Sequence, residues 1–101
     1  MSKLIPEHIL NQIPTLYSTE NEPDPTVYIK LFTPDSAWSW YITEYDPEER
    51  LCFGLVKGFE TELGYFSLEE LEALRGPARM PLQIDKSFKP TRLEKIREEI
   101  S

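Results

Sequence analysis

The sequence predicts a small single α+β domain spanning residues 1–101, with an antiparallel sheet of three to four strands in a meander and short flanking helices. Three observations predict this class. Apolar residues alternate with a period of two through the middle of the chain, turn-forming residues separate these runs, and helical spacing with capping residues occurs near both ends. A chain of 101 residues, of which 40% are hydrophobic, is long enough for one core.

The first element is expected to be a short amphipathic helix from Pro6 to Ile13. Proline is tolerated in the first turn of a helix, where its missing N–H would be unpaired in any case, and Pro14 ends the run. The segment from Ser18 to Pro25 gathers small polar residues, acids and prolines, which predicts a loop. The apolar side chains at near-helical spacing are Ile5, Ile9, Leu10 and Ile13.

The next two alternating runs predict a β-hairpin. Thr26 to Phe32 and Trp38 to Tyr45 each alternate, and Thr33 to Ser36 supply the turn between them. Successive side chains of a strand point to opposite faces, and both faces carry bulk here, so we expect the sheet to be covered on both sides. One face of the second strand should carry Trp38, Trp40 and Ile42, and the other Tyr41, Thr43 and Tyr45.

Two more strands complete the predicted meander. Asp46 to Glu49 is typical of a turn, and the alternation from Leu51 to Leu55 predicts a third strand that Gly58 ends. A shorter fourth strand is expected from Leu63 to Phe66. The large aromatic side chains expected to help fill the core are Trp38, Trp40 and Phe53.

Two capping patterns predict the remaining helices. Ser67 lies three residues before Glu70, the spacing of a capping box, and the following helix should end at Gly76. Thr91 and Glu94 repeat the pattern, so a last helix should start there. Its narrow apolar stripe, expected to dock on the sheet or on a partner, consists of Leu93, Ile96 and Ile100.

The net charge of −7 is unevenly distributed along the chain. Residues 44–72 carry nine acids and two bases, whereas residues 73–101 carry four acids and seven bases. Within that basic part, residues 78–89 are expected to form an extended connector with a short strand near Leu82 to Ile84. An acidic middle argues against direct nucleic-acid binding, which depends on clustered Lys and Arg, and leaves only the tail from Arg75 to Arg97 as a candidate.

The segments LFTPDSAWSWYITEYDPEE and LCFGLVKGFETELGYFSLEELEALRGP resemble a family of small acidic bacterial proteins catalogued only as a domain of unknown function. The resemblance extends from Leu4 to Phe88. It implies no catalytic residue, substrate or cofactor. Members of this family are often carried by mobile genetic elements, so the resemblance implies an accessory protein of such an element.

The sequence contains no residue pattern that is typical of a catalytic or metal-binding site. Cys52 lies in an alternating strand and is expected to pack in the core, and His8, the single histidine, is expected at the surface of the first helix or half-buried there. These two residues cannot supply a zinc site without many acids, so no metal or cofactor is expected. One cysteine forms no internal disulfide, and no apolar run approaches the roughly 20 residues of a membrane helix, so we expect a cytoplasmic protein.

The sequence favours a non-enzymatic protein that binds a basic protein surface through acidic turns and exposed aromatics. A narrower version is a DNA mimic, in which carboxylates take the place of phosphates on a host defence or regulatory protein. Tyr28 joins Tyr41 and Tyr45 as an aromatic candidate on the outer face. The predicted interaction surface consists of Tyr41, Glu44, Tyr45, Asp46, Glu48, Glu49, Glu60 and Glu62.

Two other functions stay open at this point. One is a small ligand-binding protein or enzyme with a pocket between the sheet and the helices, using Cys52, His8 or a pair of carboxylates. The other is nucleic-acid binding by the basic tail. Exposed strand edges permit a dimer without requiring one, so the sequence leaves the oligomeric state open.

Overall fold

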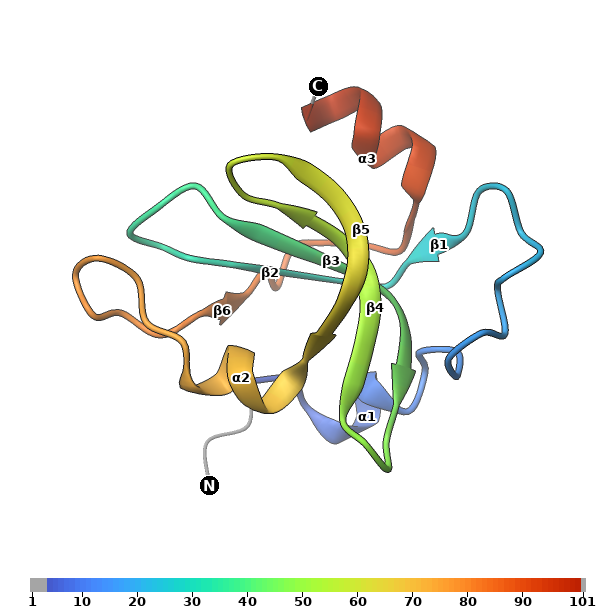
Figure 1. Cartoon of the computed structure of the whole chain (residues 1–101), viewed down its shortest axis with the longest axis horizontal. Helices are drawn as coiled ribbons and strands as arrows, with labels where there is room; N and C mark the ends of the chain where they lie inside the picture. The colour runs from blue at the N-terminus through green and yellow to red at the C-terminus, as the bar shows by residue number, and fades with distance from the viewer. Residues whose placement is uncertain (1–3, 101) are drawn as a thin grey trace.

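The computed structural model describes residues 4–100, and its central feature is a five-stranded antiparallel sheet in the order β5-β4-β3-β2-β6 (Figure 1). A two-stranded sheet, β1 with β7, lies beside it. The α+β class is confirmed. The strands are β1 Thr26–Val27, β2 Ile29–Phe32, β3 Ser39–Asp46, β4 Leu51–Lys57, β5 Thr61–Ser67, β6 Gln83–Ile84 and β7 Thr91–Arg92, and the helices are α1 Glu7–Leu10, α2 Leu68–Ala73 and α3 Leu93–Ile100.

The sheet is larger than the predicted three to four strands because the connector after α2 adds a fifth. In β6, Ile84 pairs with Leu31 of β2, at the place where a short strand was expected. The predicted strand from Thr26 to Phe32 is divided in two. Its first part pairs with β7, where Thr26 lies opposite Arg92, while its second part pairs with β3. The connector therefore returns the chain to the sheet and places α3 beside β1.

A β-bulge in β3 changes which side chains share a face. The pairing of β3 with β4 shifts register between Ile42 and Glu44. A bulge adds one residue to a strand and so reverses the alternation beyond it. Tyr45 consequently packs in the same core cluster as Trp40 and Ile42, whereas Tyr41 packs in the cluster on the other face. The predicted pairing of Tyr45 with Tyr41 on one face was wrong for this reason.

Both faces of the sheet are covered, as the sequence predicts. On one face, α1, α2 and the N-terminal segment cover a core whose sheet residues include Leu31, Trp40 and Ile42. On the other face, α3 packs through Leu93 and Ile96, which confirms the expected docking of its stripe. The buried residues of this second core are Val27, Tyr41, Leu55, Leu93 and Ile96.

Trp38 and Trp40 stack with ring centroids 5.9 Å apart and belong to the α2 side, in agreement with their predicted core position. Phe53 does not join them. It pairs with Glu44 and Tyr65 across the neighbouring strands and lies on the α3 side. The bulge places Glu44 on the same face as Phe53, so the aromatic group expected from the sequence is split between two faces.

The two predicted helix caps have different outcomes. The Ser67 hydroxyl accepts a hydrogen bond from the Glu70 N–H at 3.3 Å, which confirms the cap of α2. At α3 the Glu94 N–H instead donates to Asp24 Oδ1 at 2.8 Å, and the Thr91 hydroxyl donates to the Lys89 carbonyl. The cap of α3 thus comes from a distant loop, which local spacing could not reveal.

No helix among residues 4–100 is long and apolar enough to cross a membrane.

The first helix, α1, is shorter than the predicted helix from Pro6 to Ile13. The chain leaves α-helical geometry after Leu10, and bonds between residues three apart, such as Ile13 N–H to the Leu10 carbonyl at 3.1 Å, continue the turn.

Candidate functional site

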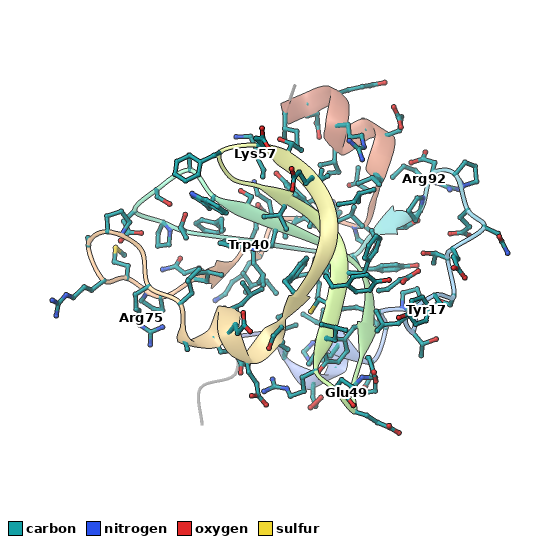
Figure 2. All side chains as sticks on the ribbon, viewed as in Figure 1. Tyr17, Trp40, Glu49, Lys57, Arg75 and Arg92 are labelled. Carbon is teal, nitrogen blue, oxygen red and sulfur yellow. The ribbon has the colours of Figure 1, made fainter. Side chains whose placement is uncertain are left out.

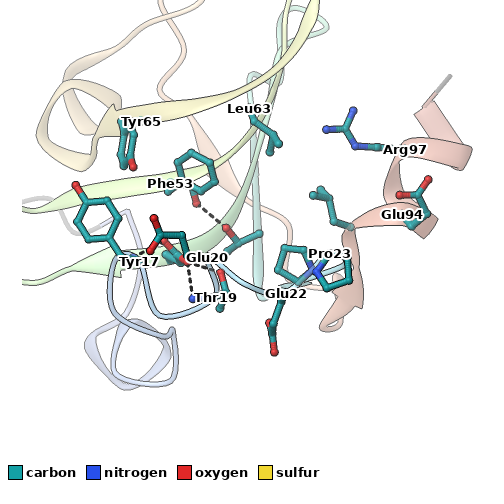
Figure 3. Close-up of a pocket in the computed structure, with 14 residues that line it drawn as sticks. Tyr17, Thr19, Glu20, Glu22, Pro23, Phe53, Leu63, Tyr65, Glu94 and Arg97 are labelled. Atoms are coloured by element: carbon teal, nitrogen blue, oxygen red, sulfur yellow. Dashed lines mark hydrogen bonds between the residues drawn. The ribbon is translucent and has the colours of Figure 1, made fainter.

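A pocket of about 450 Å³ lies between the α3 side of the sheet, the loop of residues 17–25 and helix α3 (Figure 3). The sheet contributes side chains from β3, β4 and β5, and the helix contributes its first and second turns. Three segments distant in sequence therefore meet here. The residues that shape its interior are Tyr17, Glu44, Phe53, Leu63, Tyr65 and Arg97.

Glu44 forms the floor of the pocket and is only 4% exposed. Its Oε1 accepts a hydrogen bond from the Tyr17 N–H at 2.8 Å, and its Oε2 accepts one from the Thr19 N–H at 2.9 Å and another from the Thr19 hydroxyl. These three hydrogen bonds compensate the carboxylate for the water that it loses on burial. Glu44 therefore holds the loop of residues 17–25 against the sheet.

Tyr17 is held in an uncommon conformation at one end of the pocket. Its φ of 68° lies in the left-handed region, which residues other than glycine seldom adopt, and the bond from its N–H to Glu44 fixes it there. Its ring centroid lies 6.3 Å from that of Tyr65, which in turn lies 4.8 Å from that of Phe53. Figure 3 shows the two tyrosine side chains pointing toward each other, with their ring planes tilted by 58°.

Desolvation and a hydrogen bond to Tyr17 raise the pKa of Tyr65 above its ordinary value. The phenol of Tyr65 therefore stays protonated at neutral pH and is available as a hydrogen-bond donor or acceptor. Together with its exposed ring, this makes Tyr65 suited to binding rather than to acid–base chemistry near pH 7.

At the opposite end of the pocket, Arg97 of α3 extends toward Leu63 of β5 (Figure 3). Three exposed acids stand around the pocket, whereas Arg97 is the only base that lines it among the described residues. The local field is thus negative, and it favours a cationic group on any ligand. The exposed acids are Glu20, Glu22 and Glu94.

This arrangement supports binding better than catalysis. Both oxygens of Glu44 are engaged by loop donors, so the carboxylate has little capacity left to take a proton from a substrate. Cys52 is fully buried on the opposite face, where burial raises its pKa to about 12, and His8 is exposed on α1. Among residues 4–100 no group of three or more His, Cys, Asp or Glu side chains is placed to hold a metal ion.

A second, more apolar pocket of about 420 Å³ lies between the sheet and α2. Trp38, Trp40 and Phe66 form its sheet side. Leu71 and Leu74 form its helix side, so aromatic and aliphatic surfaces face each other. It lies between the sheet and a helix, as the alternative functional hypothesis requires, but neither Cys52, His8 nor a pair of carboxylates lines it.

The sequence model of a family described as "Protein of unknown function (DUF2958)" matches residues 4–96. The chain belongs to the DUF2958 family. Neither the curated proteins nor the solved structures gave a significant match. Membership confirms the resemblance to a domain of unknown function, and the family description assigns no activity to this DUF2958 chain.

The predicted interaction surface of the DUF2958 chain is divided by the fold. Tyr41, Glu44 and Tyr45 are buried and so unavailable to a partner in this conformation. The other five acids are at least partly exposed at the two turns that flank β4. Glu49 and Lys57, which mark the two turns, lie at opposite ends of the molecule (Figure 2). One acidic cluster contains Asp46, Glu48 and Glu49, and the other contains Glu60 and Glu62.

Of the six large apolar or aromatic side chains that the described residues expose, four lie on β5 or next to it, and sequence reasoning missed them. Phe59 is 96% exposed at the turn between β4 and β5, and its ring meets Trp38 edge-on at 5.5 Å. Leu63 and Tyr65, on the outer strand β5, are 44% and 52% exposed, and Tyr17 is 60% exposed. Alternation cannot tell an edge strand from a central one, so it gave no signal that the β5 side chains would remain exposed.

Proposed function

We propose that this DUF2958 protein is a non-enzymatic interaction protein, an acidic accessory protein of a bacterial mobile element, that binds a basic surface of a protein partner. The observation that carries the proposal is the combination of exposed apolar side chains and exposed acids at the end of the β4–β5 hairpin. Phe59 lies there beside Glu60 and Glu62, and Leu63 and Tyr65 follow along β5, with side chains on the opposite face of the sheet from Glu62. Large exposed side chains of this kind rimmed by charge are typical of protein-binding sites.

Other acids of the chain already have partners within the fold. Glu72 forms a two-bond ion pair with Arg50, with distances of 3.1 and 3.0 Å, and Asp85 lies 4.0 Å from Lys30. Asp35 accepts a hydrogen bond from the Ala78 N–H at 2.8 Å. Because these groups and Glu44 act within the fold, they are less available to a basic partner than the exposed acids at the two turns.

The contact is assigned to the turn with Glu60 and Glu62, because Phe59, the most exposed aromatic side chain of the described residues, lies between them and the end of β4. The turn with Glu48 and Glu49 has the same type of charge without a comparable exposed aromatic group. It provides a matched comparison, since Glu48→Gln with Glu49→Gln removes as much charge as Glu60→Gln with Glu62→Gln, at the opposite end of the hairpin.

Affinity capture with these variants tests the proposal. The tagged wild type and the two double variants are incubated with lysate of the bacterium that carries the gene, at low and at moderate salt, and bound proteins are quantified by mass spectrometry. We expect one protein with a basic surface to be captured by the wild type and by E48Q/E49Q, and to be lost with E60Q/E62Q and at moderate salt. Equal capture by all three forms, or capture of no basic protein, would contradict the proposal.

If this protein is a DNA mimic, which is the narrower form of the proposal, the captured protein must have two further properties. The partner would itself bind nucleic acid, and duplex DNA would compete with this protein for it. Simultaneous binding of DNA and this protein to the partner would exclude the mimic while leaving the broader proposal intact.

The apolar pocket between the sheet and α2 favours a second candidate function, a small-molecule-binding protein. Trp38 and Trp40 line that pocket, so an aromatic ligand would change their fluorescence. A thermal-shift screen of small aromatic compounds, followed by fluorescence titration, tests this candidate. Leu74→Glu would place a charge in the pocket and should abolish any true binding there, and the absence of a saturable ligand would argue against the candidate.

A further inference from the structure

The strand β5 forms a long open edge of the central sheet. It is seven residues long and pairs with β4 on one side, while the opposite edge of the sheet, β6, is only two residues long. Figure 1 shows β5 crossing the front of the molecule, and β5 is the end strand of the sheet among the described residues. An open edge presents unpaired backbone N–H and C=O groups, and natural proteins usually shorten, charge or interrupt such edges.

The hydrogen bonds at the two ends of the β4–β5 ladder determine which residues of β5 face outward. The Gly58 N–H donates to the Glu60 carbonyl at 2.9 Å, and the Leu68 N–H donates to the Arg50 carbonyl at 2.9 Å. Residue pairs in an antiparallel ladder alternate between bonded and non-bonded, and the register of β4 with β5 is continuous. The bonds at both ends of the ladder therefore give the same assignment of bonded and non-bonded pairs. The residues whose N–H and C=O groups point away from β4 are therefore Thr61, Leu63, Tyr65 and Ser67.

Of the usual devices that block an edge, β5 carries only the charge of Glu62. Its sequence, TELGYFS, contains neither proline nor lysine, and its pairing with β4 shows no bulge. A Cβ built on Gly64 would meet no atom within 4 Å, so the face of the strand opposite to Leu63 and Tyr65 is open at its middle. By contrast, the short β6 begins directly after Pro81 and Leu82, and it ends at Ile84, immediately before Asp85.

The outward backbone groups and the exposed side chains of β5 belong to the same residues. Leu63 and Tyr65 line the pocket of about 450 Å³ with their side chains, and their N–H and C=O groups lie on the open edge. A strand added beside β5 would lie about 4.8 Å from it, so every second side chain of that strand would be placed beside Leu63 or Tyr65 at the pocket.

We propose that β5 binds an extended, basic segment of a partner protein as an additional strand, with alternate apolar or aromatic side chains of that segment seated on Leu63 and Tyr65. The charge around the edge determines the class of occupant. Glu60 and Glu62 lie on the strand and its turn, and acids of the loop and of α3 surround the pocket. Lys or Arg on the added strand complements these acids, whereas a second copy of this chain would bring another net charge of −7 to the edge.

The inference rests on the proposed function and specifies how the partner is held. A displayed library of random twelve-residue peptides supplies the probe, and the most enriched sequence is then made as a synthetic peptide. We expect enriched peptides to alternate apolar or aromatic residues with Lys or Arg. Amide hydrogen exchange of the wild-type protein with and without that peptide provides the decisive readout.

In the free protein the amides of Gly64 and Phe66, which bond to β4, should exchange slowly, and those of Leu63 and Tyr65 should exchange faster. Peptide binding should slow exchange at Leu63 and Tyr65 by at least about tenfold. Failure to enrich any basic alternating peptide, or binding that leaves exchange at these two residues unchanged, would overturn the inference.

A proline variant tests strand addition independently of the proposed function. Leu63→Pro removes an outward N–H and no bond to β4, whereas Leu63→Val keeps the N–H as a matched control. We expect L63P to lose the peptide and the captured partner by at least about tenfold, and L63V to retain both. Retention of the partner by L63P together with its loss by E60Q/E62Q would uphold the proposed function and overturn strand addition. If L63P does not fold, the exchange measurement on the wild type still decides.

Discussion

Asp24 and Glu94, 70 positions apart in the sequence, are joined by a hydrogen bond of 2.8 Å from the Glu94 N–H to the carboxylate of Asp24. Two further bonds support this junction, from the Leu93 N–H to the Pro25 carbonyl at 2.9 Å and from the Arg92 guanidinium to the Asp24 carbonyl at 3.0 Å. The loop and the helix that form two walls of the candidate pocket are thus fastened to each other.

Asp24→Ala should destabilise the domain by about 1 kcal/mol, the usual effect of removing an N-cap side chain. Thr91→Ala should have a smaller effect, because the Thr91 hydroxyl bonds to the Lys89 carbonyl and does not cap the helix. Urea unfolding of both variants checks this order. A larger loss for T91A than for D24A would show that the local capping pattern, and not the distant loop, stabilises α3.

Glu44→Ala should destabilise the domain by about 2 to 4 kcal/mol, since it removes the buried carboxylate that accepts from the partly buried N–H groups of Tyr17 and Thr19. The loop of residues 17–25 should lose its anchor, which faster amide exchange at Tyr17 and Thr19 would report. Glu20→Ala, at an exposed loop position, is the control and should change stability by less than about 0.5 kcal/mol. Unchanged exchange in E44A would mean that other contacts hold the loop.

Gly54→Ala and Gly64→Ala should differ sharply although the two glycines pair across β4 and β5. A Cβ on Gly54 would lie 1.8 Å from the Tyr41 carbonyl oxygen, so the backbone of β3 would have to shift. A Cβ on Gly64 would meet nothing within 4 Å. We expect G54A to be unfolded or destabilised by more than about 3 kcal/mol and G64A to be near neutral. Similar melting temperatures would contradict the close approach at Gly54.

Cys52 should resist alkylation in the folded protein. The thiol is fully buried, and burial raises its pKa from 9.0 to about 12, so it stays protonated at pH 8. Iodoacetamide should modify it only after unfolding, as mass spectrometry would detect. Because the folded pKa lies above the unfolded one, this thiol also lowers stability as pH rises from 9.0 toward about 12. Rapid modification of the native protein at pH 8 would contradict its burial.

Acid should weaken the contacts of Asp85. The Ser87 hydroxyl, which donates to Asp85 Oδ1 at 2.7 Å, is the main cause that lowers the pKa of this carboxyl below its ordinary value, with Lys30 a smaller one. A lowered folded pKa means that the stabilisation is present above the unfolded pKa of 3.8 and is lost as pH falls through the folded pKa. Ser87→Ala should therefore make the free energy of unfolding fall less between neutral pH and pH values below about 4 than it does in the wild type, as urea unfolding at several pH values would measure.

Local sequence patterns were sufficient for much of this fold. The alternation from Leu51 to Leu55 and the Ser67 cap predicted elements that the structure contains, since each depends on neighbours in the chain. The bulge beside Glu44 was not predictable, because its extra residue becomes visible only once β4 is paired with β3. The Asp24 cap was missed for the same reason, as it joins residues that only the tertiary fold brings together.

The candidate site was less predictable than the fold. The sequence predicted correctly that acidic residues lie at the turns. It did not predict that Tyr41 and Tyr45 are buried, because their burial depends on α3 and on the bulge. The exposure of Leu63 and Tyr65 depends on β5 being the last strand of the sheet, and strand order is a global property. Charge patterns therefore indicated the type of surface, whereas its position required the strand order and the packing of the loop.

The salt dependence of partner binding tests the central claim most directly. The captured partner would be purified, and its dissociation constant measured at several salt concentrations for wild type, E60Q/E62Q and E48Q/E49Q. We expect wild-type affinity to fall with salt. E60Q/E62Q should bind about 5- to 30-fold more weakly at low salt and show a flatter dependence, since each lost surface charge pair contributes up to about 1 kcal/mol. E48Q/E49Q should follow the wild type. Coincident curves for all three proteins would contradict recognition of a basic partner through the β4–β5 turn.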